Sequence, residues 1–302
     1  MKVLVTGGIG FIGKHVVNEL IENKYDVAII DEQSTNEQFE HHRNIRCYSV
    51  DINSDLDGIF ETEKPDCLIH LAAQVDVGQS IINPKLDATT NILGTIHVLE
   101  KCNKHDVKKV IFSSTAAVYG DPIYLPVDEK HPQLPLSFYG ISKLTAEHYI
   151  KTYCGIHGLN FTILRYSNVY GPGSANSKGE GNVISIFLNK MLEDSNPIIF
   201  GDGNQTRDFI YVKDIATANV AAIEQGNNQI LNVSTNTKTS LNNLVRMINN
   251  LLVKDIEPIY SEGRNGDILH SYLNNKKALN TLNWKAKYSL EQGLNMTLLE
   301  LK

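Results

Sequence analysis

The chain has 302 residues, of which 42% are hydrophobic, which is enough for one large or two modest domains with a buried core. Its 28 basic and 34 acidic residues give a net charge of -6 without a dense Lys/Arg run, which argues against a nucleic-acid or anionic-membrane surface. The four cysteines are widely spaced, so the sequence predicts neither a metal site nor a disulfide framework. With no leader-like start and no apolar run of about 18 residues, we expect a cytoplasmic protein that does not bind membranes.

The first half of the chain alternates strand-like and helical patterns. Short β-branched and apolar runs predict strands, and apolar residues at helical spacing between them predict helices. The expected strands are 2–6, 26–30, 45–50, 67–71, 109–114 and 160–165, and a long helix is expected over 84–105. Such alternation is typical of an α/β fold with a doubly wound parallel sheet, covered by helices on both faces. We expect residues 1–166 to form this domain.

After residue 166 the pattern changes to shorter elements and polar loops, which indicates a smaller C-terminal lobe over 167–302. The helices expected there are 183–193, 212–224, 241–253 and 290–301. Because no flexible linker separates the halves, we expect an approximate boundary and some interleaving of the two.

A glycine-rich turn follows the first expected strand. Gly7, Gly10 and Gly13 form a Gly-x-x-Gly-x-x-Gly pattern, and a helical pattern begins directly after it. A pyrophosphate that binds amides at a helix N-terminus needs such glycines, because side chains would obstruct its approach. Asp31 ends the next strand, where a carboxylate binds a ribose 2′-hydroxyl and repels a 2′-phosphate. The sequence therefore predicts a dinucleotide site that favours NAD over NADP. Asp51, after the third strand, is either an adenine contact or an exposed carboxylate.

A tyrosine and a lysine at helical spacing, Tyr139 and Lys143, are the candidate catalytic pair. A tyrosine that acts as a base needs its pKa moved from about 10 towards about 7. One cation about 4 Å away supplies energy of that order, so we expect Lys143 to provide most of this change and a cationic cofactor the rest. Tyr272 and Lys276 share the spacing, but they lie in a polar stretch without a preceding buried strand. We therefore take the first pair as functional.

These motifs resemble the extended short-chain dehydrogenase/reductase family, NAD-dependent epimerase/dehydratase type. The residues that carry the resemblance are Thr6-Gly7-Gly8-Ile9-Gly10-Phe11-Ile12-Gly13, Asp31, His70-Leu71-Ala72-Ala73, Asn91, Ser113-Ser114-Thr115, and Tyr139 with Lys143. Within that family the chain is most similar to the UDP-glucose 4-epimerases. That likeness rests on Ser113-Ser114-Thr115-Ala116-Ala117-Val118-Tyr119-Gly120, Arg165-Tyr166-Ser167-Asn168-Val169-Tyr170-Gly171-Pro172, Phe200-Gly201-Asp202-Gly203, Gln205-Thr206-Arg207-Asp208-Phe209 and Arg264-x-Gly266-Asp267. The resemblance covers essentially the full length.

The resemblance implies a Rossmann-type, NAD-dependent isomerase with tightly bound NAD and a UDP-glucose or UDP-galactose substrate. Tyr139, a phenolate held by Lys143, would remove the sugar 4-hydroxyl proton beside the catalytic hydroxyl of Thr115, while the C4 hydride moves to NAD and then returns to the other face of the 4-keto sugar. The implied cofactor contacts are Gly7, Gly10, Phe11, Ile12, Gly13, Asp31, Asp51, Ile52, Ala72, Tyr139 and Lys143. The implied substrate contacts are Thr115, Asn168, Asn182, Val183, Phe200, Gln205, Arg207, Arg264, Asp267 and Ser271.

The substrate side has two informative features. Arg207 and Arg264 suit a diphosphate, because each guanidinium can make paired charge-assisted hydrogen bonds. By resemblance, Ser271 stands where some family members have a bulky tyrosine against the sugar C2 substituent. We therefore expect room for an N-acetyl group, which adds UDP-GlcNAc and UDP-GalNAc to the candidate substrates. His70 and Asn91 are expected to be structural.

Other functions remain open at this point. A sugar-nucleotide 4,6-dehydratase carries an acidic pair where this chain has Ala116 and Ala117, which argues against that reaction. A UDP-glucuronate 4-epimerase needs one basic residue near the sugar, which the sequence does not locate. A non-catalytic NAD-sensing regulator could lose the tyrosine, and the joint presence of Thr115, Tyr139 and Lys143 argues against it.

By family analogy we expect a homodimer that pairs the 84–105 helix and the helix of Tyr139.

Overall fold

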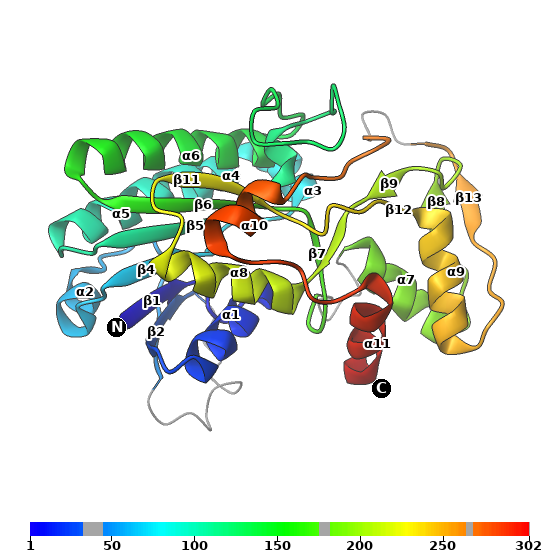
Figure 1. The fold of residues 1–302 in the computed structure, drawn as a ribbon, viewed down its shortest axis with the longest axis horizontal. Helices are drawn as coiled ribbons and strands as arrows, with labels where there is room; N and C mark the ends of the chain where they lie inside the picture. Colours follow the sequence, from blue (N-terminus) through cyan, green and yellow to red (C-terminus); the bar gives the residue numbers. More distant parts are fainter. Residues whose placement is uncertain (33–44, 175–181, 264–267, 302) are drawn as a thin grey trace.

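A parallel β-sheet lies at the centre of the larger lobe in the computed structural model, which describes residues 1–32, 45–174, 182–263 and 268–301 (Figure 1). Among these residues, seven strands pair in parallel in the order β11-β6-β5-β4-β1-β2-β3. The predicted doubly wound α/β fold is confirmed. In chain order the strands are β1 (Lys2–Thr6), β2 (Asp26–Asp31), β3 (Arg46–Ser49), β4 (Cys67–His70), β5 (Lys109–Thr115), β6 (Asn160–Tyr166) and β11 (Gln229–Val233).

Helices cover both faces of this sheet, because its strands are apolar on both sides. Successive side chains of β1 alternate between two apolar clusters: Val3 and Val5 lie in one, and Leu4 lies in the other. The first cluster is covered by α1 (Phe11–Glu22), α8 (Val212–Glu224) and α10 (Lys276–Leu282). The second is covered by α2 (Asp57–Glu63), α5 (Gly94–Lys104) and α6 (Phe138–His157).

The strand order creates a switch point between β1 and β4. The chain runs outward from β1 to β2 and β3, then returns past β1 to begin β4 on its other side. Connections therefore leave β1 and β4 in opposite directions, and ligands of such sheets bind in the crevice that opens there, at the carboxyl ends of the strands. The backbone is tight at this point: a Cβ on Gly7, after β1, would meet the nitrogen of Ala72, after β4, at 2.5 Å.

The long helix predicted over 84–105 is interrupted in the structure. It consists of α4 (Pro84–Ala88), a π-helical turn η2 (Thr89–Leu93) and α5, and it follows the short helix α3 (Val77–Ile82). Asn91, within the π turn, is buried and donates from Nδ2 to Asp87 and to the hydroxyl of Ser142, both at 3.1 Å. A π turn inserts one residue while leaving helical spacing intact on either side, so apolar periodicity does not reveal it.

The smaller lobe surrounds a third apolar cluster and lies to the right in Figure 1. Its strands form two-stranded pairs, β7 with β10 and β8 with β13 in parallel, and β9 with β12 antiparallel. Its elements are β7 (Asn168–Tyr170), α7 (Val183–Leu192), β8 (Ile198–Phe200), β9 (Thr206–Arg207), β10 (Phe209–Tyr211), β12 (Thr239–Ser240), α9 (Leu241–Leu252), β13 (Ile259–Ser261) and α11 (Leu290–Leu301).

The second half of the chain also completes the main sheet. Strand β11 pairs with β6, and α10 packs on the first apolar cluster through Ala278 and Leu282. Strand β11 was not predicted from the sequence. Three core elements of the larger lobe, α8, β11 and α10, thus come from residues beyond 166, and the domain division at 166 stays a prediction.

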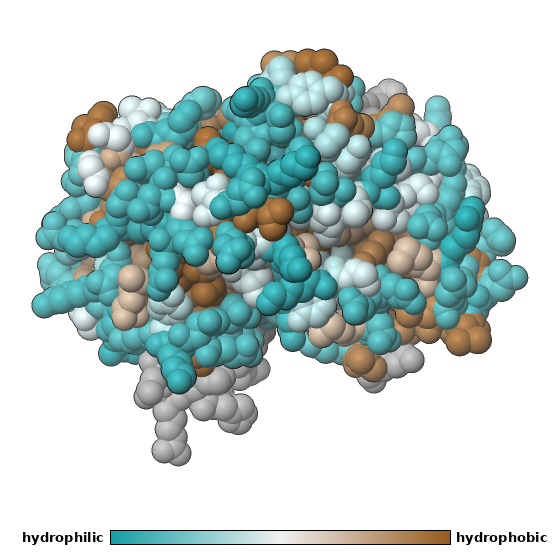
Figure 2. All heavy atoms as spheres, in the orientation of Figure 1, coloured by the Kyte–Doolittle hydropathy of each residue, from teal (hydrophilic) through white to brown (hydrophobic). Residues whose placement is uncertain are grey.

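The surface is largely hydrophilic on the face that Figure 2 shows. Apolar side chains gather at the top of this face over the loop 120–137, where Ile123, Leu134 and Leu136 are each 60% or more exposed. Within the described ranges, no helix combines the length and apolar character that crossing a bilayer requires.

Candidate active site

The glycine-rich turn between β1 and α1 is shaped by two close contacts. Gly7 has φ +72° and donates to the carbonyl of Ile30 at 2.8 Å, and a Cβ on Gly13 would lie 2.0 Å from the carbonyl oxygen of Gly7. Gly10 differs, because a Cβ there would meet only that same oxygen, at 3.4 Å. The fold therefore demands glycine at Gly7 and Gly13, whereas the missing side chain at Gly10 leaves the backbone open to a ligand.

The start of α1 suits a pyrophosphate. Gly10 is its N-cap and, in the described structure, no side chain caps the first turn, so the amides there point outward from a 12-residue helix with its positive dipole end. Asp31 is only 7% exposed at the end of β2, and its Oδ2 accepts from the amide of Ile9 at 2.9 Å. The turn and this carboxylate are thus held together, which fits the diphosphate and ribose of a dinucleotide.

The other predicted cofactor contacts border this crevice in different ways. Asp51 is exposed and accepts from the amide of Asn53 at 2.8 Å. Ile52 is buried in the second apolar cluster. Ala72 follows β4 and donates to the hydroxyl of Thr6 at 3.3 Å. Phe11 and Ile12 lie in the first turn of α1, partly buried against the cluster of the smaller lobe.

Tyr139 and Lys143 lie in the first turns of α6, next to the end of β5. Ser137 caps this helix by accepting from the amide of Gly140 at 3.0 Å. A Cβ on Gly140 would meet the carbonyl of Ala117 at 2.8 Å, so the helix approaches the 3-10 turn η3 (Ala116–Val118) that follows Thr115. Thr115 ends β5 close enough to the Tyr139 hydroxyl to lower the pKa of that phenol. The structure therefore brings together the three predicted catalytic residues.

Lys143 is almost completely buried, at 3% exposure. Its Nζ lies 4.2 Å from the centroid of the Phe112 ring, which belongs to β5. Burial lowers the pKa of Lys143 to about 7, although the carboxylates of Glu147 and Asp87 oppose that change. A lysine with such a pKa exchanges its proton near neutral pH.

The pKa of Tyr139 corrects one expectation from the sequence. Burial raises it to about 12, and the neighbouring Thr115 hydroxyl offsets only part of that effect. The prediction that Lys143 by itself brings this pKa most of the way towards about 7 is wrong for the protein without ligands, because desolvation penalises the phenolate more than the neighbours favour it. Without ligands the phenol of Tyr139 therefore stays protonated at neutral pH.

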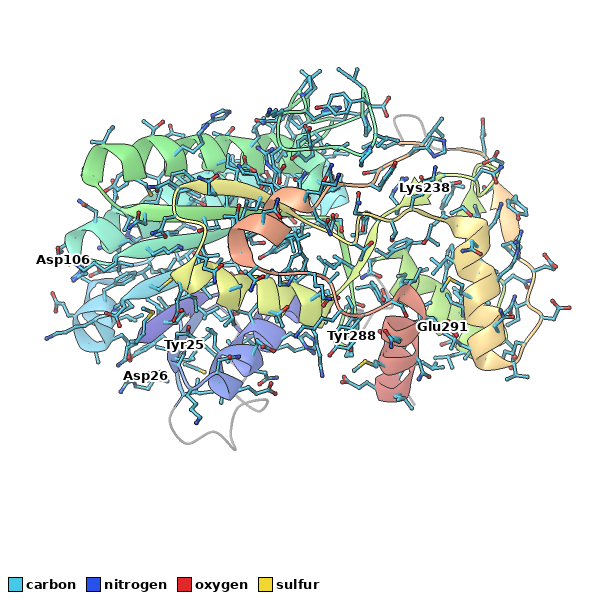
Figure 3. All side chains as sticks on the ribbon, viewed as in Figure 1. Tyr25, Asp26, Asp106, Lys238, Tyr288 and Glu291 are labelled. Atoms are coloured by element: carbon cyan, nitrogen blue, oxygen red, sulfur yellow. The ribbon has the colours of Figure 1, made fainter. Side chains whose placement is uncertain are left out.

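The second tyrosine–lysine spacing has no such geometry. Lys276 is the first residue of α10, whereas Tyr272 precedes the N-cap of that helix, so the two are not one helical turn apart. The carbonyl of Tyr272 accepts from Val127 at 3.0 Å, and Nζ of Lys238 lies 5.9 Å from its ring centroid. Figure 3 labels Lys238 near β9 and β12, on the side of the smaller lobe.

His70 has a structural environment. Its two ring nitrogens lie 2.7 Å from the hydroxyl of Thr6 and 3.1 Å from that of Thr95, and burial lowers its pKa to about 3. It is 1% exposed and stays neutral across the physiological range. Together with the buried bonds of Asn91, this agrees with the structural roles expected for both residues.

The smaller lobe presents several of the predicted substrate contacts. Asn168 on β7 is exposed. The guanidinium of Arg207 on β9 donates to the carbonyl of Thr206 at 2.9 Å. Gln205 donates from Nε2 to the carbonyl of Phe200 at 2.6 Å, which links two further predicted contacts.

Asn182 has a partner within the protein at each end of its amide. It is the N-cap of α7: Oδ1 accepts from Ser185 at 3.0 Å and Nδ2 donates to the carbonyl of Val169 at 2.9 Å. Val183 is the first residue of α7, so the two predicted substrate contacts Asn182 and Val183 together form the start of this helix. Arg264 and Asp267 lie outside the described residues.

Ser271 lies in a segment that joins the two lobes. Its amide donates to Thr206 of β9 at 3.1 Å, and two residues later Leu273 forms an isolated bridge with Val127 of the larger lobe. The predicted C2-facing residue thus sits where the segment crosses between the lobes.

Buried charged residues around the site are the part that sequence reasoning missed. Glu147 and Arg165 form a buried ion pair with 2.6 Å between Nη2 and Oε2, and Asp208 is 1% exposed. A signal for Glu147 was available, because it lies one turn beyond Lys143 on the inward face of α6. Asp208 belongs to a motif that the sequence analysis quoted without giving it a role.

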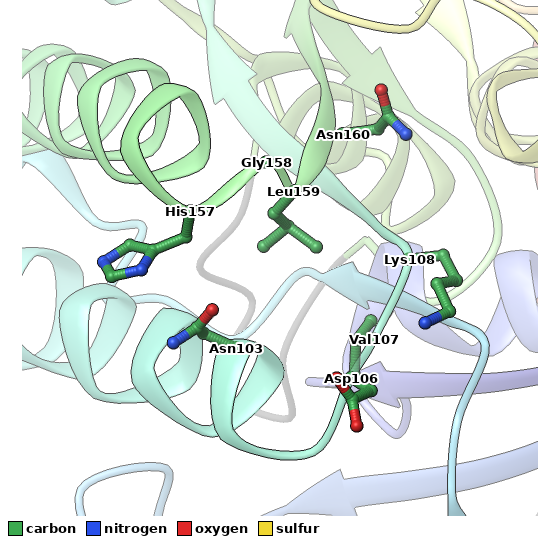
Figure 4. Close-up of a pocket in the computed structure, with 8 residues that line it drawn as sticks. All are labelled: Asn103, Asp106, Val107, Lys108, His157, Gly158, Leu159 and Asn160. Carbon is green, nitrogen blue, oxygen red and sulfur yellow. The ribbon is translucent and has the colours of Figure 1, made fainter.

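A separate hollow of about 190 Å³ lies at the opposite end of the sheet (Figure 4). Lys108 and Asn160 line it, next to the amino ends of β5 and β6. It therefore holds none of the site residues, which gather at the carboxyl ends.

Comparison with known proteins agrees with this geometry. Residues 3–234 match the model of the NAD dependent epimerase/dehydratase family. A protein of Methanocaldococcus jannaschii, provisionally named a UDP-glucose 4-epimerase, is 47% identical over 97% of this chain and 95% of its own length. The crystal structure of UDP-glucose 4-epimerase from Thermotoga maritima with UDP-glucose has a TM-score of 0.95 and 41% identity, over 100% of this chain and 98% of that one. UDP-N-acetylglucosamine 4-epimerase from Methanobrevibacter ruminantium, solved with UDP-N-acetylmuramic acid, has a TM-score of 0.93 and 35% identity, over 99% and 97%. The chain belongs to the NAD-dependent epimerase/dehydratase family.

Proposed function

We propose that this protein is an NAD-dependent 4-epimerase that interconverts UDP-glucose and UDP-galactose. The observation that carries the proposal is the placement of Tyr139 and Lys143 on the first turns of α6, with Thr115 beside Tyr139, at the same sheet edge as the glycine-rich turn. Relatives named as UDP-glucose 4-epimerases support it over nearly the whole chain.

Each catalytic residue has one task in this reaction. Tyr139 takes the proton of the sugar 4-hydroxyl and later returns it. Lys143 stabilises the phenolate as an ammonium, and Thr115 donates a hydrogen bond that orients the reacting oxygen. NAD, when bound, would supply a reversible acceptor for the C4 hydride, so the overall reaction would be an isomerisation without net oxidation.

The cofactor would be held by this chain's own turn and carboxylate. The amides at the start of α1 face the pyrophosphate, and Asp31 faces the adenosine ribose. Because the nicotinamide ring of NAD is cationic, the bound cofactor would favour the Tyr139 phenolate, which burial alone disfavours. Proton removal would therefore be linked to cofactor occupancy, and NAD that is regenerated each turnover can stay bound.

The smaller lobe would hold the UDP group. Asn168 and Arg207 face the diphosphate in this proposal, with Arg264 as the second guanidinium. Phe200 lies against the uracil, and the start of α7 at Asn182 and Val183, Gln205 and Asp267 complete the contacts. This assignment rests on the family resemblance and on the exposure of Asn168 in β7.

Acetylated sugars are a second proposed substrate class. The observation that favours them is the small side chain of Ser271 in the segment that bridges the lobes. A relative named as a UDP-N-acetylglucosamine 4-epimerase supports the same range. UDP-glucuronate is the remaining alternative, since relatives named as UDP-glucuronate 4-epimerases also match this chain.

We further propose a homodimer through the helices on one side of the larger lobe. Ile81, Ile82 and Leu86 on α3 and α4 are 61%, 76% and 49% exposed, and Ile141 and Tyr149 on the neighbouring α6 are each 45% exposed. Apolar side chains on adjacent helices are typical of a face that another chain covers. The cytoplasmic location stays a prediction.

Incubation with three UDP-sugars tests the proposed reaction. Purified protein is mixed separately with UDP-glucose, UDP-GlcNAc and UDP-glucuronate, without added NAD, and the sugars formed are identified. We expect UDP-galactose from UDP-glucose, and UDP-GalNAc from UDP-GlcNAc if Ser271 leaves the expected room. A product from UDP-glucuronate alone would favour a UDP-glucuronate 4-epimerase. If no substrate gives a product, even after NAD is added, the proposal is wrong.

A further inference from the structure

Asp208 has an unusual environment for a carboxylate. It lies between β9 and β10, is 1% exposed and accepts five hydrogen bonds from described residues. Its Oδ1 accepts from the amide and hydroxyl of Thr235, at 3.0 and 2.6 Å, and from the hydroxyl of Ser167 at 3.4 Å. Its Oδ2 accepts from the amides of Asn236 and Leu273, at 3.1 and 3.3 Å. These donors are all neutral, so the charge is stabilised by dipoles that converge on it.

These donors come from segments that are far apart in the sequence. Ser167 joins β6 to β7, Thr235 and Asn236 form the turn after β11, and Leu273 lies just before α10. In this turn Asn236 adopts a left-handed backbone conformation, with φ +58°, and the successive amides of Thr235 and Asn236 both donate to the carboxylate of Asp208. One side chain therefore ties the end of the main sheet to the smaller lobe and to the segment that crosses between them.

Two of these segments, and the segment of Asp208 itself, carry a residue assigned to the substrate. Asn168 follows Ser167, and its amide donates to the backbone carbonyl of Asp208 at 2.9 Å. Arg207 directly precedes Asp208 in the chain, and Ser271 lies two residues before Leu273. The proposed cofactor contacts, in contrast, lie on or just after β1 to β4 and on α1 and α6, and none of these segments donates to this carboxylate among the described residues.

We propose that Asp208 is a positioning residue that fixes the segments bearing Asn168, Arg207 and Ser271 relative to one another, and so sets the affinity for the UDP-sugar while leaving NAD binding unchanged. This inference rests on the proposed function. Asp208 touches no substrate itself. It acts through the backbone positions of the residues that do.

Asp208→Asn is the informative substitution. The amide keeps one acceptor oxygen, but its NH2 group then faces backbone amides that can only donate, so those segments must shift. We expect KM for UDP-glucose and the dissociation constant for UDP each to rise about tenfold, as is typical when buried donors lose their acceptor. We expect kcat and the NAD content of the purified protein to stay within about twofold of wild type.

Asp214→Asn is the matched control. Asp214 in α8 is also fully buried and accepts two backbone amides, from Lys287 at 2.8 Å and Tyr288 at 3.2 Å, but these anchor the C-terminal segment instead of the substrate side. Both variants should lower Tm. Only the Asp208 variant should raise KM and weaken UDP binding, which separates positioning from general destabilisation.

The outcomes distinguish this inference from the proposed function. If wild type binds UDP and turns over UDP-glucose but Asp208→Asn keeps the normal KM and UDP affinity, as Asp214→Asn should, then Asp208 is only a stabilising residue. The inference is then overturned. If wild type neither binds UDP nor turns over UDP-sugars, the proposed function fails and the inference fails with it. Should Asp208→Asn not fold, Thr235→Val removes only the 2.6 Å hydroxyl donor. It should raise KM about threefold at unchanged NAD content, and an unchanged KM would equally overturn the inference.

Discussion

Arg165 of β6 donates two parallel hydrogen bonds to the carboxylate of Glu147 in α6, 2.9 Å from Nε to Oε1 and 2.6 Å from Nη2 to Oε2. Both side chains are almost completely buried, and Nη1 of Arg165 also donates to the hydroxyl of Tyr119 at 2.9 Å. This pair fixes the helix that carries Tyr139 and Lys143 to the sheet whose carboxyl edge forms the site.

Removing one partner of this pair should be costly. Glu147→Ala leaves a buried guanidinium without its carboxylate, and we expect the free energy of unfolding to fall by about 3–5 kcal/mol. Asp194→Ala is the control, because its ion pair with Lys254 lies at the surface and should contribute less than about 1 kcal/mol. Urea denaturation measures both, and equal losses in the two variants would contradict the role given to the buried pair.

Tyr139→Phe should abolish catalysis without abolishing binding. Without the phenol, no group takes the 4-hydroxyl proton, so we expect kcat to fall by about 10²–10⁴ while NAD content and UDP affinity stay normal. Tyr272→Phe, at the spacing that is not helical, should keep at least about half of the wild-type rate. Unaltered turnover in the Tyr139 variant would remove this residue from the mechanism.

The buried Lys143 predicts a pH dependence of stability. Its pKa of about 7 in the folded protein lies below its ordinary value of 10.5, so the unfolded chain holds more protons between these values and stability rises with pH across that window. Tyr139, with a raised pKa of about 12, makes stability fall with pH only above about 10. Lys143→Met should lack this part of the rise.

The difference in unfolding free energy between wild type and Lys143→Met isolates this effect. Other buried groups such as Lys109, whose pKa burial lowers to about 8, contribute equally to both proteins. Cofactor-free samples are unfolded in urea between about pH 7 and about pH 9.5, where the wild-type advantage should grow. A difference that does not change with pH would show that Lys143 has an ordinary pKa.

Alanine substitutions at two glycines of the dinucleotide turn should affect different properties: Gly13→Ala should lower stability, whereas Gly10→Ala should weaken NAD binding. Gly13→Ala places a Cβ 2.0 Å from the carbonyl oxygen of Gly7, so the turn must open and Tm should drop by several degrees. Gly10→Ala meets that oxygen only at 3.4 Å, so apo stability should change by less than about 1 kcal/mol. NAD affinity should nevertheless weaken about tenfold, because the new methyl group faces the pyrophosphate. Normal NAD binding by Gly10→Ala would place the cofactor elsewhere.

Ser271→Tyr should narrow the range of sugars. A tyrosine fills the space expected beside the C2 substituent, so kcat/KM for UDP-GlcNAc should fall at least about tenfold relative to that for UDP-glucose. Ser271→Ala keeps the space and serves as the control. An unchanged ratio in the tyrosine variant would show that this position does not determine the accepted sugar.

The sequence predicted the elements whose signals are local. The glycine pattern after β1, Asp31 at the end of β2 and the helix of Tyr139 each follow from a few neighbouring residues, and the structure places them as expected. Strand β11 was missed because Gln229 and Asn232 interrupt its apolar pattern, and its partner β6 lies far away in the chain. Such a strand is defined by its pairing more than by its own composition.

The charges inside the site could not be predicted in the same way. A spacing places Lys143 near Tyr139, but the pKa values of both depend on how much water the fold removes, which only packing determines. Glu147 and Asp208 are carboxylates, which as a class are usually exposed, and their burial depends on partners such as Arg165 and Thr235 from distant segments.

The position of β11 at the sheet edge constrains how this enzyme can be divided or recombined. A fragment that stops at residue 166 would end on β6, leaving one edge of that buried strand without its hydrogen-bonding neighbour and ready to pair with another chain. Exchange of the substrate-binding lobe between relatives must therefore keep α8, 229–233 and α10 with the first half. A chimaera cut once at residue 166 would inherit an aggregation-prone edge on β6, whereas one that keeps these three elements with the first half would leave β6 paired on both sides.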